Sequence, residues 1–247
     1  MHDGKSIKEI SVKDSRSKRI VSSDLIAYYL SLLQNFYTNL GIPKQRIRFR
    51  KLSDEEKPFY SSDSWDLEVE TSLGWIELVA CNNRGDYDLS SHARKSGKNF
   101  QVMDENEKVL PNIFELSMGI DRTLYVLMDL FFKKEKVKDE ERIVLQLPSR
   151  VSPIQVAVFP LVGKDGLPEI ANKIYEILKE NFRSSYDESG SIGKMYRRQD
   201  EIGTPICITI DYDTKKDKSV TVRNRDTMKQ KRVKIKDLEK ELNKILK

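Results

Sequence analysis

The fold of the first half of this chain is decided by the stretch WDLEVETSLGWIELVAC, residues 65–81. Apolar and charged residues alternate over 65–70, as in a strand with one face in a core and the other in solvent. Leu73 and Gly74 make a turn, and the mostly apolar run 75–81 follows. We therefore predict a largely antiparallel sheet.

Further elements are predicted around this pair of strands. Before it come a lysine-rich lead-in without periodicity over 5–20, a capped helix from Ser23 to Gly41, and a half-exposed strand over 46–52. After it come a polar excursion over 82–107, a strand over 109–116, an apolar helix over 121–132 and a charged tail or linker over 133–141.

The second part of the chain has a different pattern of apolar residues, and its first elements are those of a βαβ unit. The expected elements are a strand over 154–161, a helix over 167–182, a Gly- and Ser-rich turn over 188–193, a helix through Arg198, strands over 205–212 and 219–225, and a closing helix over 235–246. The predicted fold is α/β (α+β): an antiparallel-sheet domain over 1–148, then a small α/β domain with a mixed sheet over 149–247.

Composition excludes several classes of protein. The hydrophobic fraction is 38% and the charged fraction 34%, so the chain should fold and stay in solution. No apolar run approaches the roughly 18 residues of a membrane span, and residues 1–10 do not resemble a signal peptide, so we expect a cytosolic protein. Cys81 and Cys207 stand apart in apolar runs and are predicted to be buried thiols.

Positive charge is concentrated in the second part. The formal net charge is −1 over residues 1–148 and +6 over 149–247. A lysine- and arginine-rich segment over 215–236 suits a polyanion such as nucleic acid, because each neutralised phosphate releases counterions. A solvated hairpin face is an equally good explanation of the charge alone.

One candidate site lies where a strand is followed by a helix, over residues 115–122. There Gly119 allows a close backbone approach to a ligand, and Arg122 in the first helical turn offers donors suited to phosphate. Glu115 could receive an ammonium group. The alternative is that Glu115 and Arg122 form a structural ion pair or face water.

A second candidate is Glu77, a carboxylate on an otherwise apolar strand, which must be paired or reached by solvent. The polar loop after it contains Arg84 and His92. His92 and His2 are the two histidines, so no metal site is expected. The sequence also lacks a P-loop, a dinucleotide fingerprint and a nucleophile elbow.

Five segments in this order resemble the C-terminal half of glycyl-tRNA synthetases of the archaeal and eukaryotic type. They are RIRFRKL (46–52), SSDSWDLEVETSLGWIELVACNNRGDYDLSSH (61–92), NIFELSMGIDR (112–122), GSIGKMYRRQDEIGTPICITIDYDT (190–214) and SVTVRNRDTMKQKRV (219–233). The resemblance covers about residues 21–240. It implies part of a class II catalytic domain, with 112–122 as motif 3, followed by an anticodon-binding domain.

The resemblance also implies roles for individual residues. Glu115 and Ser117 would contact the glycine substrate, while Glu77, Leu78 and Arg122 would lie against ATP, which enters with Mg²⁺ as substrate. Arg84 is a further active-site candidate. In the second domain the anticodon arm of tRNA-Gly is expected to contact Arg197, Arg198, Asp200, Glu201, Arg223, Arg225 and Lys229. The alternative is that some of the acidic residues only pair with neighbouring arginines.

Two departures from the family pattern matter. Leu116 stands where the family usually has proline between the glutamate and the serine. No segment resembles motif 1, which builds the dimer interface of the complete enzyme, or motif 2, so the chain is expected to be a fragment that does not activate glycine alone. A non-catalytic nucleic-acid-binding accessory protein derived from the synthetase scaffold is the alternative; a fragment of another class II synthetase fits the stretch 75–92 less well.

Overall fold

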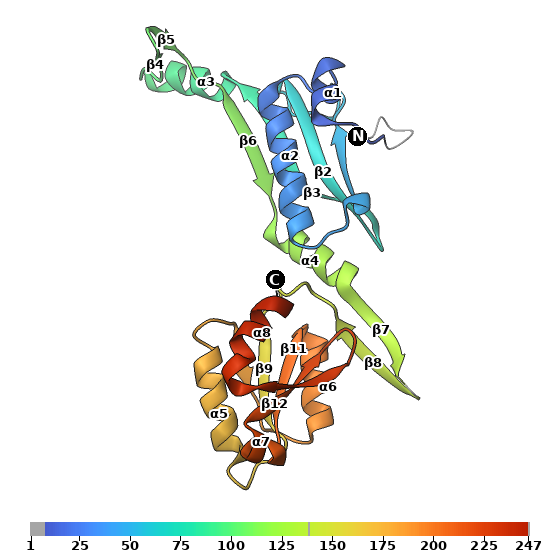
Figure 1. Ribbon diagram of the computed structural model, residues 1–247. Helices are drawn as coiled ribbons and strands as arrows, with labels where there is room; N and C mark the ends of the chain where they lie inside the picture. The colour runs from blue at the N-terminus through green and yellow to red at the C-terminus, as the bar shows by residue number, and fades with distance from the viewer. Residues whose placement is uncertain (1–7, 138, 247) are drawn as a thin grey trace. The chain divides into compact units, whose positions relative to one another are not determined.

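The computed structural model describes residues 8–137 and 139–246. The chain forms two compact units, which divide between Leu130 and Phe131. Each has its own sheet (Figure 1). The boundary predicted from the sequence lies at 148/149, and the difference is a hairpin that the structure assigns to the second unit.

The first unit is built on an antiparallel sheet in the order β1-β2-β3-β6. Its strands are β1 (Ile47–Lys51), β2 (Asp63–Thr71), β3 (Gly74–Gly85) and β6 (Ile113–Met118). The predicted antiparallel sheet is confirmed. Trp65, Leu67 and Val79 are at most 1% exposed and form the core on one face.

Helix α2 (Asp24–Asn39) covers that apolar face of the sheet (Figure 1). It begins as predicted, because the Ser23 hydroxyl accepts a hydrogen bond from the Ile26 amide at 3.2 Å. Its Tyr29 ring stacks on Phe114 of β6 at 4.9 Å. Gly41, just past the helix, has a φ of 97°, which a glycine adopts without strain.

Shorter elements complete the first unit. They are α1 (Val12–Ser17), within the lead-in expected to be irregular, η1 (Lys44–Arg46), α3 (Tyr87–Ser96), the hairpin β4 (Val102–Asp104) and β5 (Glu107–Val109), and α4 (Ile120–Phe131). The predicted polar excursion is thus α3 followed by the β4–β5 hairpin, and α3 buries none of its residues.

The second unit has a five-stranded mixed sheet in the order β10-β9-β11-β12-β13. Its strands are β9 (Val156–Pro160), β10 (Ser184–Tyr186), β11 (Ile206–Ile210), β12 (Ser219–Asn224) and β13 (Gln230–Lys234). β10 and β11 pair parallel to β9, whereas β12 pairs antiparallel to β11 and β13 to β12. The predicted α/β domain with a mixed sheet is confirmed.

Helices cover both faces of this sheet. On one face α5 (Leu167–Leu178) and α8 (Leu238–Ile245) bury leucines and isoleucines against Val156, Ile208 and Val220. On the other, α6 (Ile192–Ile202) packs Met195 against Phe159 and Cys207. The remaining elements are α7 (Tyr212–Asp217) and η2 (Ile235–Asp237).

The charged segment 133–141 is not the tail or linker that its composition predicted. It contributes to an antiparallel hairpin of β7 (Phe132–Val137) and β8 (Glu140–Leu145). The hairpin is held to the unit by Val144 and by the Arg142 side chain, both 0% exposed. The prediction of a linker was wrong because composition does not show that a charged side chain, here Arg142, is buried inside the unit.

Candidate functional site

Alternation along the strands places Glu115 and Ser117 on the polar face of the first sheet, opposite α2. Phe114 lies on the α2 face, and successive side chains of a strand point to opposite faces. Glu115 pairs across the ladder with Asn82, and Ser117 with Ala80. The two residues predicted to contact the amino acid therefore share one face with the middle of β3.

Glu115 is bound by an arginine from the neighbouring strand. Arg84 Nη1 donates to Glu115 Oε2 at 2.7 Å, and Asn82 Nδ2 lies 3.4 Å from the same oxygen. Arg84 also donates from Nε and Nη2 to the two oxygens of Asp88, at 2.6 and 2.7 Å. Its guanidinium carbon lies 4.0 Å from the centre of the Tyr60 ring. The hydrogen bonds from Arg84 lower the pKa of Asp88, so this carboxyl stays ionised.

Arg122 and Glu77, both predicted to lie against ATP, are also brought together. Arg122 Nη1 donates to the backbone oxygen of Glu77 at 3.0 Å and lies 3.5 Å from its carboxylate. The side chains are 57% and 43% exposed, so both can reach a ligand. Leu78, also predicted to lie against ATP, is buried, with 2% of its surface exposed.

An ion pair between Glu115 and Arg122 was the alternative expected for this segment from the sequence. The structure gives the two residues different partners: Arg84 for Glu115, and Glu77 for Arg122. The geometry thus places one carboxylate–guanidinium pair near the end of β3 and another near its start.

A charge network that the sequence analysis missed lies on the same face across β1 and β2. Arg48 and Arg50 pair with Glu68 at 2.5 and 3.0 Å, and Arg50 also reaches Asp66 at 3.0 Å. Burial, followed by repulsion from Glu77, raises the pKa of Asp66 to about 6. The alternation in 46–52 and 65–70 was the available signal, because opposite charges at every second position face each other once the strands pair.

In the second unit, three residues predicted to contact tRNA are buried and form hydrogen bonds with other groups of the protein. Asp200 is 0% exposed, accepts two hydrogen bonds from Arg223 at 2.8 and 3.0 Å, and accepts another from Arg142 at 2.9 Å. Arg225 is 2% exposed and donates to the backbone oxygens of Gly203 and Leu147. These groups stabilise the junction between the β7–β8 hairpin, α6 and β12, and their charges are not presented to a ligand.

The other four predicted tRNA contacts lie at the surface. Arg197 and Arg198 line a hollow of about 630 Å³ beside the start of α6, together with Lys194 and Glu201. Arg197 has one weak contact there, 3.5 Å from Glu140, whereas Arg198 is paired with Asp187 at 2.5 Å. Lys229 is exposed after β12.

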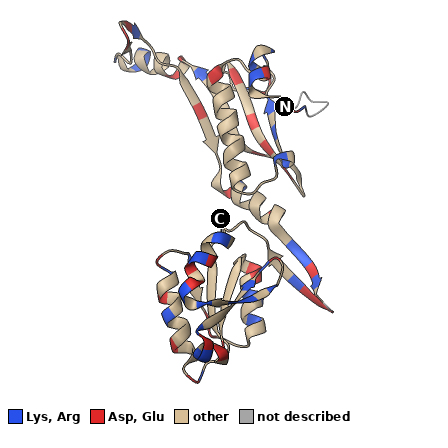
Figure 2. Cartoon of the chain, viewed as in Figure 1, with Lys and Arg blue, Asp and Glu red and all other residues tan. Residues whose placement is uncertain are grey.

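The basic segment 215–236 is partly neutralised by its neighbours, so its charge is less available than the sequence implied. Arg232 pairs with Asp211 at 2.5 Å and with Asp217 at 3.0 Å, and Lys231 pairs with Glu241. Basic and acidic residues are interspersed over this unit (Figure 2). Both thiols, Cys81 and Cys207, are buried and free, as predicted.

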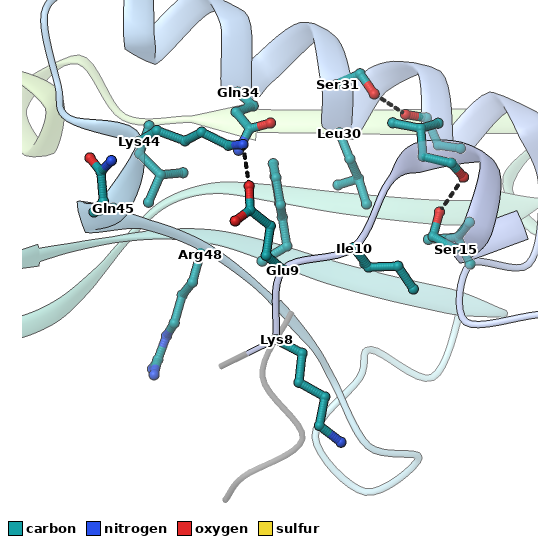
Figure 3. Close-up of a pocket in the computed structure, with 15 residues that line it drawn as sticks. Lys8, Glu9, Ile10, Ser15, Leu30, Ser31, Gln34, Lys44, Gln45 and Arg48 are labelled. Atoms are coloured by element: carbon teal, nitrogen blue, oxygen red, sulfur yellow. Dashed lines mark hydrogen bonds and ion pairs between the residues drawn. The ribbon is translucent and has the colours of Figure 1, made fainter. Parts of the chain in front are cut away.

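A separate cavity of about 240 Å³ lies between the segment before α1, helix α2 and strand β1 (Figure 3). Ile10 and Leu30 line it, and Glu9 pairs with Lys44 at 2.5 Å at its edge (Figure 3). The residues predicted to bind glycine or ATP do not line this cavity.

Within residues 8–137 and 139–246, no helix is long and apolar enough to cross a bilayer.

Comparison with known proteins finds a family match within the second unit. Residues 155–245 match the family model described as an anticodon binding domain. The chain is 45% identical over 223 residues to a glycine–tRNA ligase of Clostridium acetobutylicum, covering 89% of the chain and 48% of the relative. It is 43% identical over 206 residues to that of Treponema denticola, covering 80% of the chain and 46% of the relative.

The match extends to an archaeon. The glycine–tRNA ligase of Archaeoglobus fulgidus is 33% identical over 311 aligned positions, which cover 96% of this chain and 55% of the relative. The chain thus spans about half the length of the curated relatives it matches. The chain is therefore similar to glycine–tRNA ligases over most of its own length, and its second unit matches an anticodon-binding domain.

Proposed function

We propose that the first unit contributes the amino-acid side of the aminoacylation site of a glycine–tRNA ligase. The observation that carries this proposal is the contact between Arg84 and Glu115 on the polar face of the sheet. An amino acid brings an ammonium and a carboxylate one carbon apart, and a carboxylate beside a guanidinium offers both complementary charges. Glu115 would receive the ammonium and Arg84 the carboxylate, while the exposed hydroxyl of Ser117 contacts the same substrate.

Arg122 and Glu77 would hold MgATP, which is a substrate of the reaction. Attack of the amino-acid carboxylate on the α-phosphate develops negative charge on phosphate oxygens, and a fixed guanidinium stabilises that charge. Arg122 is 57% exposed and its hydrogen bond to the Glu77 backbone orients it, which fits this role.

The second unit is proposed to bind the anticodon arm of tRNA-Gly. Unpaired anticodon bases are the part of a tRNA that a protein can read in sequence-specific fashion. The proposed contacts are the partly exposed Arg197 and Arg198 and the exposed Glu201 and Lys229, with the arginines and the lysine on phosphates. The buried Asp200, Arg223 and Arg225 would act by holding α6 and β12 in place.

Glycine activation by this chain alone is not expected, because no segment of it resembles motif 1 or motif 2. The residues that resemble motif 3 would supply only part of an ATP site. The complete enzyme would be a homodimer in the cytoplasm. An assay of glycine-dependent exchange between pyrophosphate and ATP tests this expectation. We expect no exchange by the chain, and a rate typical of a synthetase would refute the expected inactivity of the chain alone.

Binding of tRNA is tested separately, by titrating the chain with tRNA-Gly and with a transcript altered in the anticodon alone. The proposal expects weaker binding of the altered transcript. Equal affinities would leave a basic surface without anticodon recognition and would favour the accessory-protein alternative.

A further inference from the structure

Arg84 is immobilised before any ligand arrives, because it is held on three sides. Both oxygens of Asp88 accept hydrogen bonds from its Nε and Nη2, and the Tyr60 ring lies against its guanidinium plane at 4.0 Å. Glu115 accepts from Nη1. The side chain of Arg84 is 21% exposed, so it still reaches solvent.

The groups that hold Arg84 are themselves fixed. The Tyr60 ring contacts Phe59 edge-on at 5.3 Å and lies 6.5 Å from the Tyr87 ring. Tyr87 and Asp88 begin helix α3, whereas Tyr60 lies just before strand β2. The acidic and aromatic partners of Arg84 therefore come from two segments, which meet at the Tyr60 and Tyr87 rings. The acidic residue in the first turn is also favoured by the helix dipole.

Asp88 limits how Arg84 can bind Glu115. A guanidinium beside a carboxylate tends to bind it through two parallel hydrogen bonds, which would occupy both oxygens. With Nε and Nη2 already on Asp88, Arg84 gives Glu115 one hydrogen bond, to Oε2. Within the part of the chain that the structure describes, the other oxygen of Glu115 has no donor and remains available to an ammonium group.

We infer that Tyr60 and Asp88 are positioning residues for the amino-acid site, a role that rests on the function proposed above for Glu115 and Arg84. Tyr60 keeps the guanidinium in one plane, and Asp88 prevents it from closing on Glu115. Arg84 then does not have to be ordered when glycine binds. The free-energy cost of ordering this side chain would otherwise weaken the affinity for glycine.

The test uses the full chain and the variants Tyr60→Leu, Tyr60→Phe and Asp88→Asn. Tyr60→Phe keeps the ring face and is the matched control; Asp88→Asn keeps the shape and removes the charge. Glycine is titrated into each protein and followed by NMR, and the Arg84 Nε–H signal is recorded without ligand. Unfolding monitored by tryptophan fluorescence checks that each variant is folded.

We expect the dissociation constant for glycine to rise roughly two- to tenfold in Tyr60→Leu and Asp88→Asn, the cost of ordering one long side chain, and to be unchanged in Tyr60→Phe. The Arg84 Nε–H should be protected from exchange in the wild type and in Tyr60→Phe, and lose protection in Asp88→Asn.

Three outcomes would overturn the inference in different ways. Unchanged glycine affinity in folded Tyr60→Leu and Asp88→Asn would refute the positioning role while leaving the amino-acid site intact. An equal loss in Tyr60→Phe would show that the hydroxyl, and not the ring face, matters. Absence of glycine binding by the wild type would refute the proposed amino-acid site itself, and the role built on it.

Discussion

Asp66 should make the first unit less stable as the pH rises from 4 to 7. Its side chain is 6% exposed, and burial together with Glu77 and Glu68 raises its pKa from 3.8 to about 6, although Arg50 opposes the shift. Between these pH values the folded protein binds more protons than the unfolded chain, so the free energy of unfolding falls as pH rises. A difference of about two pH units between the folded and unfolded pKa corresponds to roughly 3 kcal/mol, complete near pH 7.

Asp66→Asn removes this titration while keeping the shape of the side chain. The free energy of unfolding of the variant minus that of the wild type should therefore increase between pH 4 and pH 7, by up to about 3 kcal/mol. Loss of the hydrogen bond from Arg50 adds an offset that does not follow this titration. The change with pH, and not the absolute difference, is the quantity that reports on Asp66.

Urea denaturation at several pH values measures this difference. The two tryptophans, Trp65 and Trp75, both lie in the first unit, so their fluorescence reports on the unfolding of that unit. Asp54→Asn is the control: Asp54 is exposed and its pKa is lowered by a hydrogen bond from Lys57, so its titration lies below pH 4. A difference for Asp66→Asn that stays constant from pH 4 to 7 would refute the reasoning.

Other changes have equally definite expected results. Arg142→Met should lower the free energy of unfolding of the second unit by about 3–5 kcal/mol, since it leaves the buried Asp200 carboxylate without one of its two arginines; circular dichroism during denaturation measures this. Ser23→Ala should cost the first unit about 1 kcal/mol through loss of the helix cap, seen by tryptophan fluorescence. Arg197→Ala should reduce the slope of log Kd for tRNA against log salt by about 1, and an unchanged slope would exclude a phosphate contact there.

The fold was largely predictable because its signals are local. Ser23, the turn at Leu73 and Gly74, and the alternation over 65–70 each depend on residues within a few positions. The hairpin of β7 and β8 was missed because its stability depends on Arg142, whose partner Asp200 lies 58 positions away. No property of the segment 133–141 itself shows that the arginine next to it will be buried.

The candidate site was predictable in its residues and less so in its contacts. Glu115 and Arg122 stood out in one short segment, but their partners Arg84 and Glu77 come from another strand. The sequence drew attention to Arg84 without indicating Tyr60, which meets it through a cation–π contact between separate segments. For Asp200 the sequence left two possibilities, a contact with tRNA or a pair with nearby arginines, and the structure shows it buried and bonded to Arg223 and Arg142.

The register of β3 explains how Glu77 comes to share a face with Glu115. In a regular strand Glu77 would point to the same side as Val79, under helix α2, because residues two apart lie on one face. The ladder with β2 instead pairs Glu77 with Glu68 and Val79 with Leu67, so Leu78 is an extra residue in a bulge. Glu77 is thereby turned to the polar face, where its carboxylate lies 3.5 Å from Arg122 Nη1. A second irregularity between Asn83 and Gly85 leaves Arg84 without a partner in the ladder with β6. Two irregularities in the pairing of β3 therefore set the positions of Glu77 at the proposed ATP end of the site and of Arg84 at the amino-acid end.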